Sequence, residues 1–415
     1  MCAEPLEVRT YRSLEELEAL RENWNELLEC YPLATTFSTL EWLIPWWRSF
    51  GQSFGKDQQL LVVGFFDEAS QLVALAPLAL TRIRVAPAVS LRLLRLMGDG
   101  SHDSDNLDLP VRAGFEERVA EVLLHFLENQ RALWDFCELN TMPPESPAAN
   151  ALRQLLERKK WIVEQNDRPA SAIALPATWE EYLKHLSSKE RGKIGLRTRR
   201  LEKKYEVRIR KCAEQTEIDS LLQTLYDLHG KHWQLRGLPG TLHSPARRQF
   251  YREMAPLLLK RNRLELWVLE LKEKIVAAQF SLRHGTTVFS LQEGFDPDYS
   301  ADSVGYVLRS QVLKQLIADG IRRYDFLGGA DESKLRWGAA PGHYLDLRFA
   351  RPFSMGASYL RTQQSAVQIK SWLRDNLPKT AWQILHKTNA AIRGKAESTA
   401  AVTKNAPKAE DPQAE

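Results

Sequence analysis

The apolar and polar positions of the first half change period along the chain. Two stretches carry apolar residues at helical spacing, and Ser13 with Glu16 has the pattern of a capping box at the start of the first. Three apolar runs then have the length of strands, and a helical and an extended segment follow them. The predicted elements are helices at residues 13–28 and 39–50, strands at 60–66, 72–80 and 92–97, a helix at 116–129 and a strand at 134–139.

The second half repeats this order of elements, although its letters match the first half poorly. The last predicted helix begins near Ser303 with an apolar face of Val304, Leu308, Val312 and Leu316, and Gly320 is suited to end it. The predicted elements are a helix at 247–260, strands at 264–271, 275–283 and 287–292, this helix, and a strand at 324–327. We interpret the chain as a duplicated α/β module with a mixed sheet. The alternative is two unrelated α/β pieces whose order agrees by coincidence.

Breaks in the pattern predict four regions. An N-terminal module covers residues 1–165 and a C-terminal module 166–350, after which residues 351–395 have the pattern of an amphipathic helical tail broken at Pro378. The tail either packs on the body or lies on a membrane surface. Residues 396–415 are rich in Ala, Glu and Lys without apolar periodicity, which predicts disorder.

Composition excludes several classes of protein. The 415 residues carry a formal net charge of +4 and contain no run of 18 apolar residues, so no transmembrane helix is expected. The N-terminus lacks the basic and apolar regions of a secretory signal, so we expect a cytoplasmic protein. The cysteines, Cys2, Cys30, Cys137 and Cys212, are scattered without a paired motif, which favours reduced structural thiols and no metal.

Charge is concentrated in two segments. Residues 184–211 hold twelve Lys and Arg side chains, which indicates either a dock for an anionic partner or a solvated helix face. The segment lacks the interleaved aromatic residues that would indicate binding of single-stranded nucleic acid. The loop at 98–108 carries Asp99, Asp103, Asp105 and Asp108, whose charge should repel a pyrophosphate. We therefore expect no cofactor in the first module, and the spacing of the loop misses the EF-hand pattern.

The segment from 287 to 338 carries the most chemical information. It predicts a strand, a loop, a helix and a second strand, which form a unit with two parallel strands. The helix would begin near Asp302, with Ser303 as its cap and with Gly305 allowing close backbone approach. Free N–H groups and the helix dipole at such a start suit a pyrophosphate. By itself this pattern is weak, because many helices begin in the same way.

The same segment resembles the CelD-like and FemAB-like branch of the GNAT acyltransferases. The resemblance lies in a Gly-Phe-Asp-Pro loop, a Ser-x-Gly helix start, a Tyr-Asp-Phe strand, a Gly-rich turn and a Lys-x-x-Trp pair. Here these are Gly294–Phe295–Asp296–Pro297, Ser303 and Gly305, Tyr324–Asp325–Phe326, Gly328 and Gly329, and Lys334 with Trp337. The stretch around Trp233, Arg236 and Gly237 and the basic run at 187–204 also resemble the branch, so the likeness spans roughly 37–338 and its signature 185–338. Ser333 stands where the branch often has Tyr.

The resemblance implies acyl transfer from acyl-CoA, expected to be acetyl-CoA, to an amine or hydroxyl of a small or saccharide-linked acceptor. The thioester would lie between strands 287–292 and 324–327, with backbone amides polarising its carbonyl and no covalent acyl-enzyme. A polysaccharide or cell-envelope setting, such as cellulose biosynthesis, also comes from the resemblance. The candidate residues are Asp325, Glu293 and Lys334 for catalysis, Gly294, Phe295, Ser303, Val304 and Gly305 for the cofactor, and Trp233, Arg236 and Trp337 for the acceptor.

Each candidate also has a purely structural interpretation. Asp325 could be a buried carboxylate paired with an Arg or a backbone N–H, Glu293 a solvated loop acid, and Lys334 a surface lysine beside a core Trp337. Spacing predicts that Lys334 and Trp337 share a helix face. At the level of function, two alternatives remain. One is a FemAB-type transferase that uses aminoacyl-tRNA, and the other is a non-catalytic binding or scaffold protein, which Ser333 supports.

Overall fold

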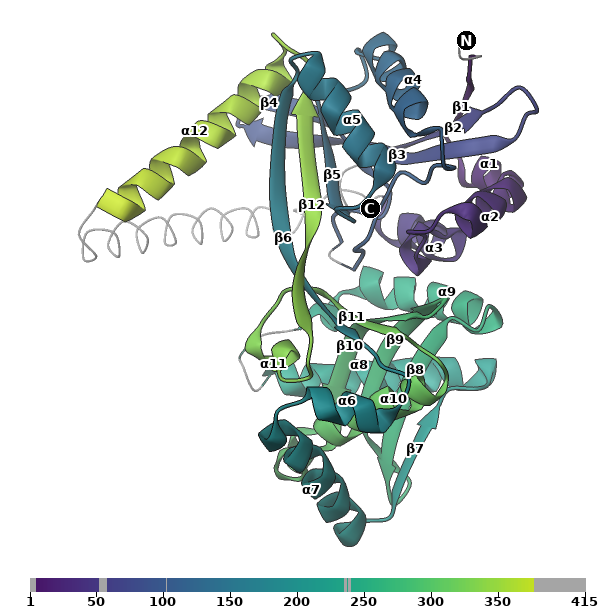
Figure 1. Ribbon diagram of the computed structural model, residues 1–415, viewed down its shortest axis with the longest axis vertical. Coiled ribbons are helices and arrows are strands. Elements are labelled where there is room, and N and C mark those ends of the chain that lie inside the picture. Colours follow the sequence, from purple (N-terminus) through teal and green to yellow (C-terminus); the bar gives the residue numbers. More distant parts are fainter. Residues whose placement is uncertain (1–4, 52–57, 102, 235–236, 238–239, 377–415) are drawn as a thin grey trace, which may run out of the picture. The chain divides into compact units, whose positions relative to one another are not determined.

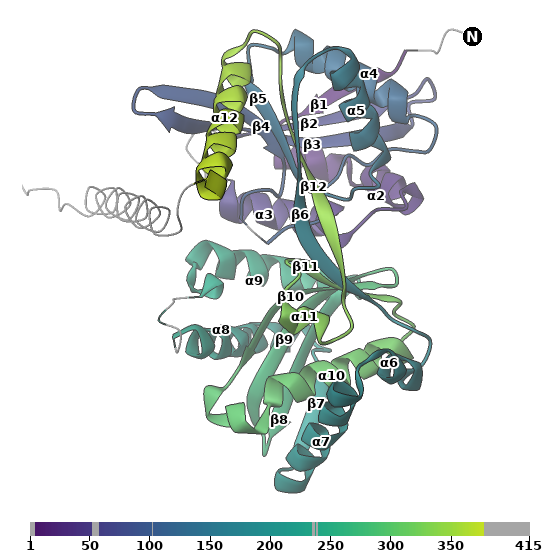
Figure 2. The same ribbon diagram turned by 60° about the vertical axis from the view of Figure 1, so that its left-hand side comes forward.

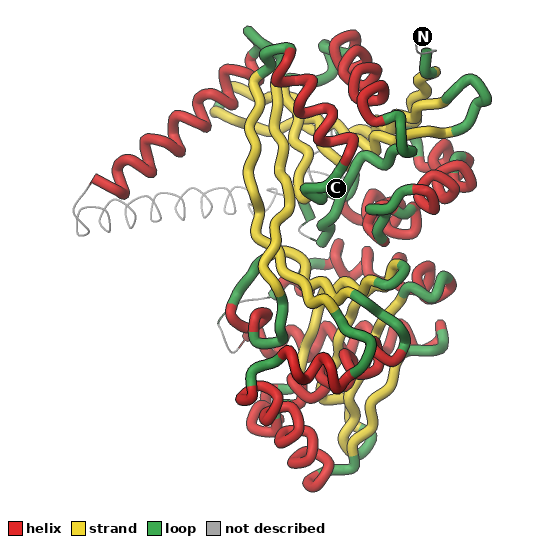
Figure 3. The backbone as a smooth tube through the Cα atoms, in the orientation of Figure 1, coloured by secondary structure: helices red, strands yellow, loops and turns green. Residues whose placement is uncertain are grey.

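The computed structural model describes residues 5–51, 58–101, 103–234, 237 and 240–376 (Figures 1 and 3). Contacts divide the chain into a unit of Met1–Ala357, which contains the whole sheet, and a unit of Ser358–Glu415. The predicted tail helix begins as α12, Met355–Asn376. The predicted break at Pro378 and the segment 396–415 lie outside the described residues. No helix among the described residues has the length and apolar character needed to cross a membrane.

The first half confirms the predicted order and adds elements that the pattern missed. The capping box forms, because the Glu16 backbone N–H donates to Ser13 Oγ (3.2 Å) and the Ser13 N–H to the Glu16 carboxylate (3.0 Å). The single helix predicted at 13–28 is two helices. The elements are β1 Glu7–Tyr11, α1 Leu14–Ala19, α2 Arg21–Cys30, η1 Thr36–Ser38, α3 Leu40–Phe50, β2 Gln59–Phe66, β3 Leu72–Ala86, β4 Val89–Leu96, α4 Glu116–Asn129, β5 Phe136–Met142, α5 Pro147–Arg158 and β6 Ile162–Ala174.

The second half repeats this plan after two helices, Trp179–His185 and the basic Ser188–Lys204. Its predicted strands and its last helix are found close to their expected bounds, and Gly320 follows α10 with a positive φ of 79°. The elements are α6 Trp179–His185, α7 Ser188–Lys204, β7 Val207–Lys211, η2 Gln215–Glu217, α8 Ile218–Gln234, η3 Thr241–His243, α9 Pro245–Lys260, β8 Leu264–Leu271, β9 Lys274–His284, β10 Thr287–Phe295, η4 Pro297–Asp302, α10 Val304–Ala318, β11 Arg323–Gly328, α11 Glu332–Leu335 and β12 Ala340–Ala350.

All strands join one mixed sheet of order β1-β2-β3-β4-β5-β12-β6-β11-β10-β9-β8-β7. Each half has three antiparallel strands, β2-β3-β4 and β8-β9-β10, followed by a connection that contains a helix, α4 or α10. The strand after the connection is parallel to its neighbour, in the pairs β4/β5 and β10/β11. The structure therefore confirms the mixed sheet and the repeated order of elements.

Two long strands, β6 and β12, exchange partners between the halves (Figures 1 and 2). They pair antiparallel with each other from Ile162↔Ala350 to Ala172↔Ala340. The end of β12 also pairs with β5 of the first half, and the end of β6 pairs with β11 of the second half. Each half thus completes its sheet with a strand from the other, and the boundary predicted at residue 165 falls inside β6.

Aromatic side chains join the halves into one core. Trp42 of α3 packs edge-on against Phe250 of α9 with ring centroids 4.7 Å apart, and Phe37 packs against Phe289 of β10 at 5.3 Å. The helix α3, which carries Trp42, Trp46 and Trp47, thus anchors the interface between the halves. A second core lies between β8–β11 and α10. On the other side, α8 approaches β10 so closely that a Cβ on Gly294 would lie 2.6 Å from the His229 backbone nitrogen.

Candidate functional site

The parallel strands β10 and β11 separate after a short paired section. Their register covers Thr287↔Arg323, Val288↔Tyr324 and Phe289↔Asp325, while β10 continues beside β9 as far as Phe295. A β-bulge between Ser290 and Gln292 bends β10 where the separation begins. The backbone of β10 beyond Phe289 therefore faces an opening, as the sequence predicts for the two strands.

Several contacts hold the end of β11 away from β10. The Asp325 carboxylate accepts hydrogen bonds from Arg323 (2.9 Å) and from the backbone N–H of Leu327 (2.8 Å), and Leu327 has a left-handed φ of 61°. Lys334 Nζ donates to the backbone oxygens of Phe326 (3.2 Å) and Gly329 (3.3 Å). The bulge in β11 is thus fixed by a buried carboxylate and a half-buried lysine, and burial lowers the pKa of that lysine.

One cavity, of about 460 Å³, lies between the opening and the start of α10. All five residues predicted to bind the cofactor line it: Gly294, Phe295, Ser303, Val304 and Gly305. A Cβ on Gly305 would lie 3.3 Å from Phe295 Cδ1, so glycine keeps this wall open.

The prediction that Ser303 caps α10 is wrong. Ser303 stands at the N-cap position, but its backbone is left-handed (φ 58°, ψ 38°) and its side chain makes no capping hydrogen bond. A capping side chain needs extended backbone to reach back to the first turn, and the left-handed conformation prevents this. The first N–H groups of α10 consequently keep their hydrogen-bonding capacity for another partner.

Cations surround this first cavity. Lys193 and Arg197 of the basic helix α7 line it, with Arg309 and Arg336 from the second half, against the acids Glu190 and Glu293. The Arg197 guanidinium lies 4.3 Å from the ring centre of Tyr306, which stacks on Trp337 with centroids 4.5 Å apart. An uncapped helix start beside these cations forms an environment for an anion.

Two buried side chains in this cavity each have one polar atom without a hydrogen-bond partner among the described residues. Gln279 is 1% exposed, and its Nε2 contacts the Tyr324 hydroxyl while its Oε1 has no partner. Arg309 donates from Nη2 to Glu293, and its Nε has no partner. Because buried polar atoms are nearly always satisfied, an acceptor and a donor left open in one cavity point to a bound molecule.

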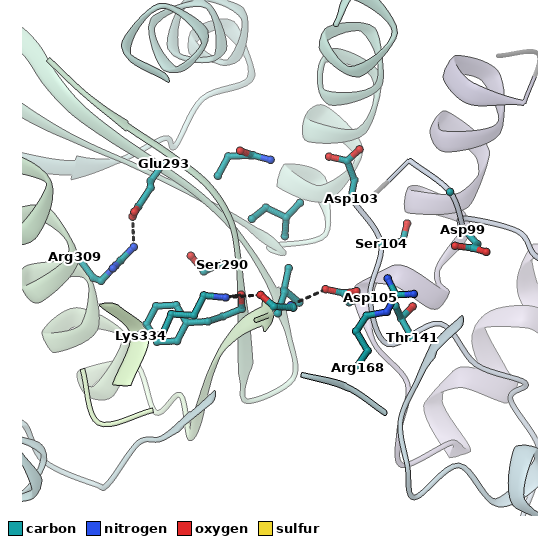
Figure 4. A pocket seen from close by; sticks show the side chains of 16 residues that line it. Asp99, Asp103, Ser104, Asp105, Thr141, Arg168, Ser290, Glu293, Arg309 and Lys334 are labelled. Carbon is teal, nitrogen blue, oxygen red and sulfur yellow. Dashed lines mark hydrogen bonds and ion pairs between the residues drawn. The ribbon is translucent and has the colours of Figure 1, made fainter. Parts of the chain in front are cut away.

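A second cavity, of about 410 Å³, lies on the other side of the opening and has walls from both halves (Figure 4). The second half contributes Ser290–Glu293, Phe326–Gly328, Arg309 and Lys334, and the first half contributes Asp99, Gly100, Asp103, Ser104, Asp105, Thr141 and Arg168. Glu293 and Arg309, joined by an ion pair in Figure 4, line both cavities. The two cavities therefore meet at the opening between β10 and β11.

The remaining candidates lie in different places. Lys334 lines the second cavity and Trp337 the first, and α11 ends at Leu335, so the predicted shared helix face does not form. Asp325 is 2% exposed and bound to Arg323, as its structural interpretation anticipated, and it lines neither cavity. Trp233 donates from Nε1 to His229 on α8 (2.9 Å) and lines neither cavity; Arg236 lies outside the described residues.

The sequence did not reveal several residues of the site, among them Asp105, Thr141, Gln279 and Arg309. Asp105 comes from the acidic loop that we interpreted only as repelling a cofactor, and its carboxylate accepts the backbone N–H of Gly328 in the other half (2.9 Å). Burial raises the pKa of Asp105 to about 6. The four acids of the loop were the one signal in the sequence that could have indicated Asp105. The residues that face Asp105 across the cavity belong to the second half, and the exchange of β6 and β12 brings them there.

Comparison with known proteins finds a family model that matches part of the second half. Residues 188–335 match the model of a family described as an acetyltransferase (GNAT) domain. The matched segment runs from α7 to α11 and contains the lining residues of the first cavity except Arg336 and Trp337. No curated protein matches the sequence.

Two solved structures share the fold over most of the chain. A structure titled "Crystal structure of FemX" is 10% identical with a TM-score of 0.57, and covers 80% of this chain and 96% of its own. A conserved protein of unknown function from Bacteroides thetaiotaomicron VPI-5482 is 14% identical with a TM-score of 0.53, and covers 83% and 100%. At such identity these similarities show the fold alone.

Proposed function

We propose that this chain transfers an acyl group, expected to be acetyl, from acyl-CoA to an acceptor bound in the second cavity. The observation that carries the proposal is the pair of open polar groups, Gln279 Oε1 and Arg309 Nε, beside the uncapped start of α10. The GNAT domain match over 188–335 supports acyl-CoA as the donor.

The donor would lie along the first cavity. Its diphosphate would accept hydrogen bonds from the first N–H groups of α10 around Gly305, with Lys193 and Arg197 neutralising its charge. The amide-containing arm would pass Gln279, whose free carbonyl oxygen suits an amide N–H. The thioester would then reach the opening between β10 and β11.

At the opening, Arg309 would stabilise the transition state. Its guanidinium packs near Phe326 and Trp337, at 5.3 and 5.6 Å from their ring centres, which fixes the plane of its donors. The unpartnered Nε would donate to the thioester oxygen as negative charge develops there, together with backbone amides of the bulged β10. A fixed, partly desolvated cation is suited to this role because it needs no reorganisation.

Among the three catalytic candidates, Glu293 is the one that would face the reacting atoms in the proposed arrangement. It lines both cavities and is paired with Arg309, so we propose that it orients the attacking group or accepts a proton from it. For Asp325 and Lys334 we propose a positioning role, because both bind the backbone of the β11 bulge. The acceptor roles of Trp233, Arg236 and Trp337, and the polysaccharide setting, remain predictions.

Calorimetry with acetyl-CoA tests the proposal. We expect one site per chain in wild type, and a Kd weakened at least about 100-fold in Gly305→Trp, because an indole at this position fills the cavity in front of α10. Glu117→Trp is the matched control, since Glu117 is exposed at the corresponding first-turn position of α4. Thermal unfolding establishes that both variants fold.

Two results would reject the proposal: equal binding by Gly305→Trp and wild type, or no binding of any acyl-CoA to folded wild type. In the second case, pull-down of aminoacylated tRNA would distinguish a FemAB-type donor from a non-catalytic scaffold.

A further inference from the structure

The cavity between the halves is lined by more carboxylates than have ion-pair partners among the described residues. Four acids line it, and two of them have cationic partners: Asp103 with Arg247 (2.8 Å) and Glu293 with Arg309. The carboxylates of Asp99 and Asp105 instead accept hydrogen bonds from neutral groups, the Asn140 amide (3.0 Å) and the Gly328 N–H (2.9 Å). Within the described ranges neither forms an ion pair, so both charges are available to a cationic ligand.

An independent observation comes from Thr141, at the end of β5. The side chain lines the same cavity and the residue is 3% exposed, yet its Oγ1 has no hydrogen-bond partner among the described residues. Its backbone has a φ of 58°, which is strained for a β-branched residue, and its N–H donates to Asp346 on β12 (2.8 Å). A buried open hydroxyl on strained backbone is typical of a residue retained for a ligand.

The cavity is also placed for transfer. It meets the donor-side cavity at Glu293 and Arg309, and its volume of about 410 Å³ lies in the range of about 300–1,000 Å³ of small-molecule sites. Both bulged strands reach it, through Thr141 of β5 and Leu327 of β11, each with a left-handed residue at the bulge. A ligand here would contact both halves at once.

We propose that the first half recognises the acceptor: a primary amine binds in this cavity as an ammonium ion, held by Asp105, Asp99 and the Thr141 hydroxyl, and Asp105 takes its proton. The inference rests on the proposed acyl transfer and adds the acceptor class and the residues that select it. Asp105 is then a catalytic residue, and Thr141 a specificity-determining one, contributed by the half that lacks the donor site.

The steps balance in atoms and charge. A protonated amine has no lone pair, so one N–H proton first passes to the Asp105 carboxylate and from there to solvent. The free amine attacks the thioester carbon, forming a C–N bond, and Arg309 stabilises the oxyanion. Collapse breaks the C–S bond, and the second proton lost by the nitrogen goes to the departing thiolate, giving amide and CoA.

An ammonium ion accounts for the two carboxylates better than an alcohol does. A neutral hydroxyl would leave Asp99 and Asp105 compensated only by nearby cations such as Arg168 and Lys334, neither of which forms an ion pair with them, when the ligand displaces water from the cavity. The groups that face Asp105 are Arg168 of β6, Asp325 of β11, Lys334 beyond it and Tyr344 of β12, with Asp99 in its own loop. Since burial raises the pKa of Asp105 to about 6, the carboxylate can accept a proton at neutral pH.

The first test compares matched acceptors with acetyl-CoA as donor, following release of the CoA thiol. The probes are primary amines, each with the alcohol that replaces its amine: D-glucosamine with D-glucose, cadaverine with 1,5-pentanediol, and 6-aminohexanoate with 6-hydroxyhexanoate. We expect turnover of amines only. Acetylation of an alcohol at the rate of its amine, or no turnover of any amine by protein that binds acetyl-CoA, would overturn the inference while leaving the donor site intact.

Three variants assign the residues, using the best amine of this panel. Asp105→Asn retains an acceptor for the Gly328 N–H, and we expect kcat/KM to fall at least about 100-fold with loss of the acidic limb of its pH profile. Thr141→Val keeps the β-branched shape, and we expect a KM raised about 3–10-fold with kcat unchanged. Asp167→Asn is the control, because this exposed acid adjoins Arg168 but does not line the cavity.

If Asp105→Asn remains within threefold of wild type while folded, Asp105 only caps the β11 bulge and the inference is wrong. If wild type does not bind acetyl-CoA in calorimetry, the proposed function fails and takes this inference with it. The two failures are therefore distinguishable.

Discussion

The open ends of the two parallel strand pairs, β4/β5 and β10/β11, have the same backbone plan and different surroundings. Each pair begins with three registered residues and then separates. After β10, the short connection 296–303 leads to an uncapped helix start beside cations. After β4, the connection 97–115 is longer, and α4 begins with Glu116 and Glu117 in its first turn.

Contacts within the first half fix much of the longer connection. The indoles of Trp42 and Trp46 donate to Ser104 (2.9 Å) and Ser101 (2.8 Å), and Asp108 accepts from Ser146 (2.5 Å) in the core. The Glu116 carboxylate accepts the Gly114 N–H at the start of α4 (2.8 Å) and so places negative charge there. These features argue against a second anion site, and the same loop can present Asp105 to the other half. The comparison teaches that duplicated backbone can be divided between donor and acceptor binding.

Substitution of Arg309 is expected to lower kcat more than any other change compared between the halves. We predict that Arg309→Met lowers kcat about 100- to 1,000-fold, because the oxyanion loses its buried donor, with little change in the Kd of acetyl-CoA. Glu121 holds the corresponding sixth position of α4 and is exposed, so Glu121→Met should leave kcat unchanged. Steady-state kinetics with the best amine and calorimetry measure the two constants. A similar loss in both variants would contradict the division between halves.

The basic helix should give a smaller effect on donor binding alone. Removing Lys193 and Arg197 together is expected to weaken acetyl-CoA binding about tenfold, with a shallower salt dependence, because two cations leave the donor cavity. The double variant Arg199→Ala/Arg200→Ala removes the same charge from exposed positions of α7 outside that cavity. Equal weakening by both double variants would mean that only the overall field of the helix matters.

The smallest effect concerns stability and the acidic loop. The pKa of Asp105 rises from 3.8 to about 6 on folding, so the charged carboxylate destabilises the folded state above pH 6 and not below pH 4. A shift of this size corresponds to about 3 kcal/mol in full. Because Asp105 is only partly buried, solvent screening reduces this effect, and Asp105→Asn should be more stable than wild type by about 1 kcal/mol at pH 8, with the difference lost near pH 4. Urea unfolding at the two pH values measures this. A variant less stable at pH 8 than at pH 4, relative to wild type, would contradict the assigned shift.

The sequence was sufficient for features that depend on neighbouring residues. The α10 start and its five lining residues gather in one cavity because 294–295 and 303–305 flank a single connection. The sequence was not sufficient to predict contacts between strands that lie far apart along the chain. Strands β6 and β12 have half-exposed, mixed patterns that do not specify a neighbour, so neither the exchange nor the position of the halves could be derived.

The missed site residues follow from the same limit. Asp105 and Thr141 face residues of the second half only because β12 crosses into the first half. Arg309 was missed because the rest of its helix, α10, is mostly apolar. The prediction that Ser303 caps α10 was wrong because a serine at this position does not by itself determine the extended backbone that capping requires. Ser333, the departure from the family pattern, contacts Asp331 through its hydroxyl and lines the donor cavity, a position that the sequence could not assign.

A crystal structure of the protein with CoA would test the central claim most directly. We predict that the diphosphate lies at hydrogen-bonding distance from the first amides of α10 at Val304–Tyr306, with the thiol end between β10 and β11 and nothing bound at the start of α4. A diphosphate at α4, or one bound away from both helices, would contradict the assignment of the donor site.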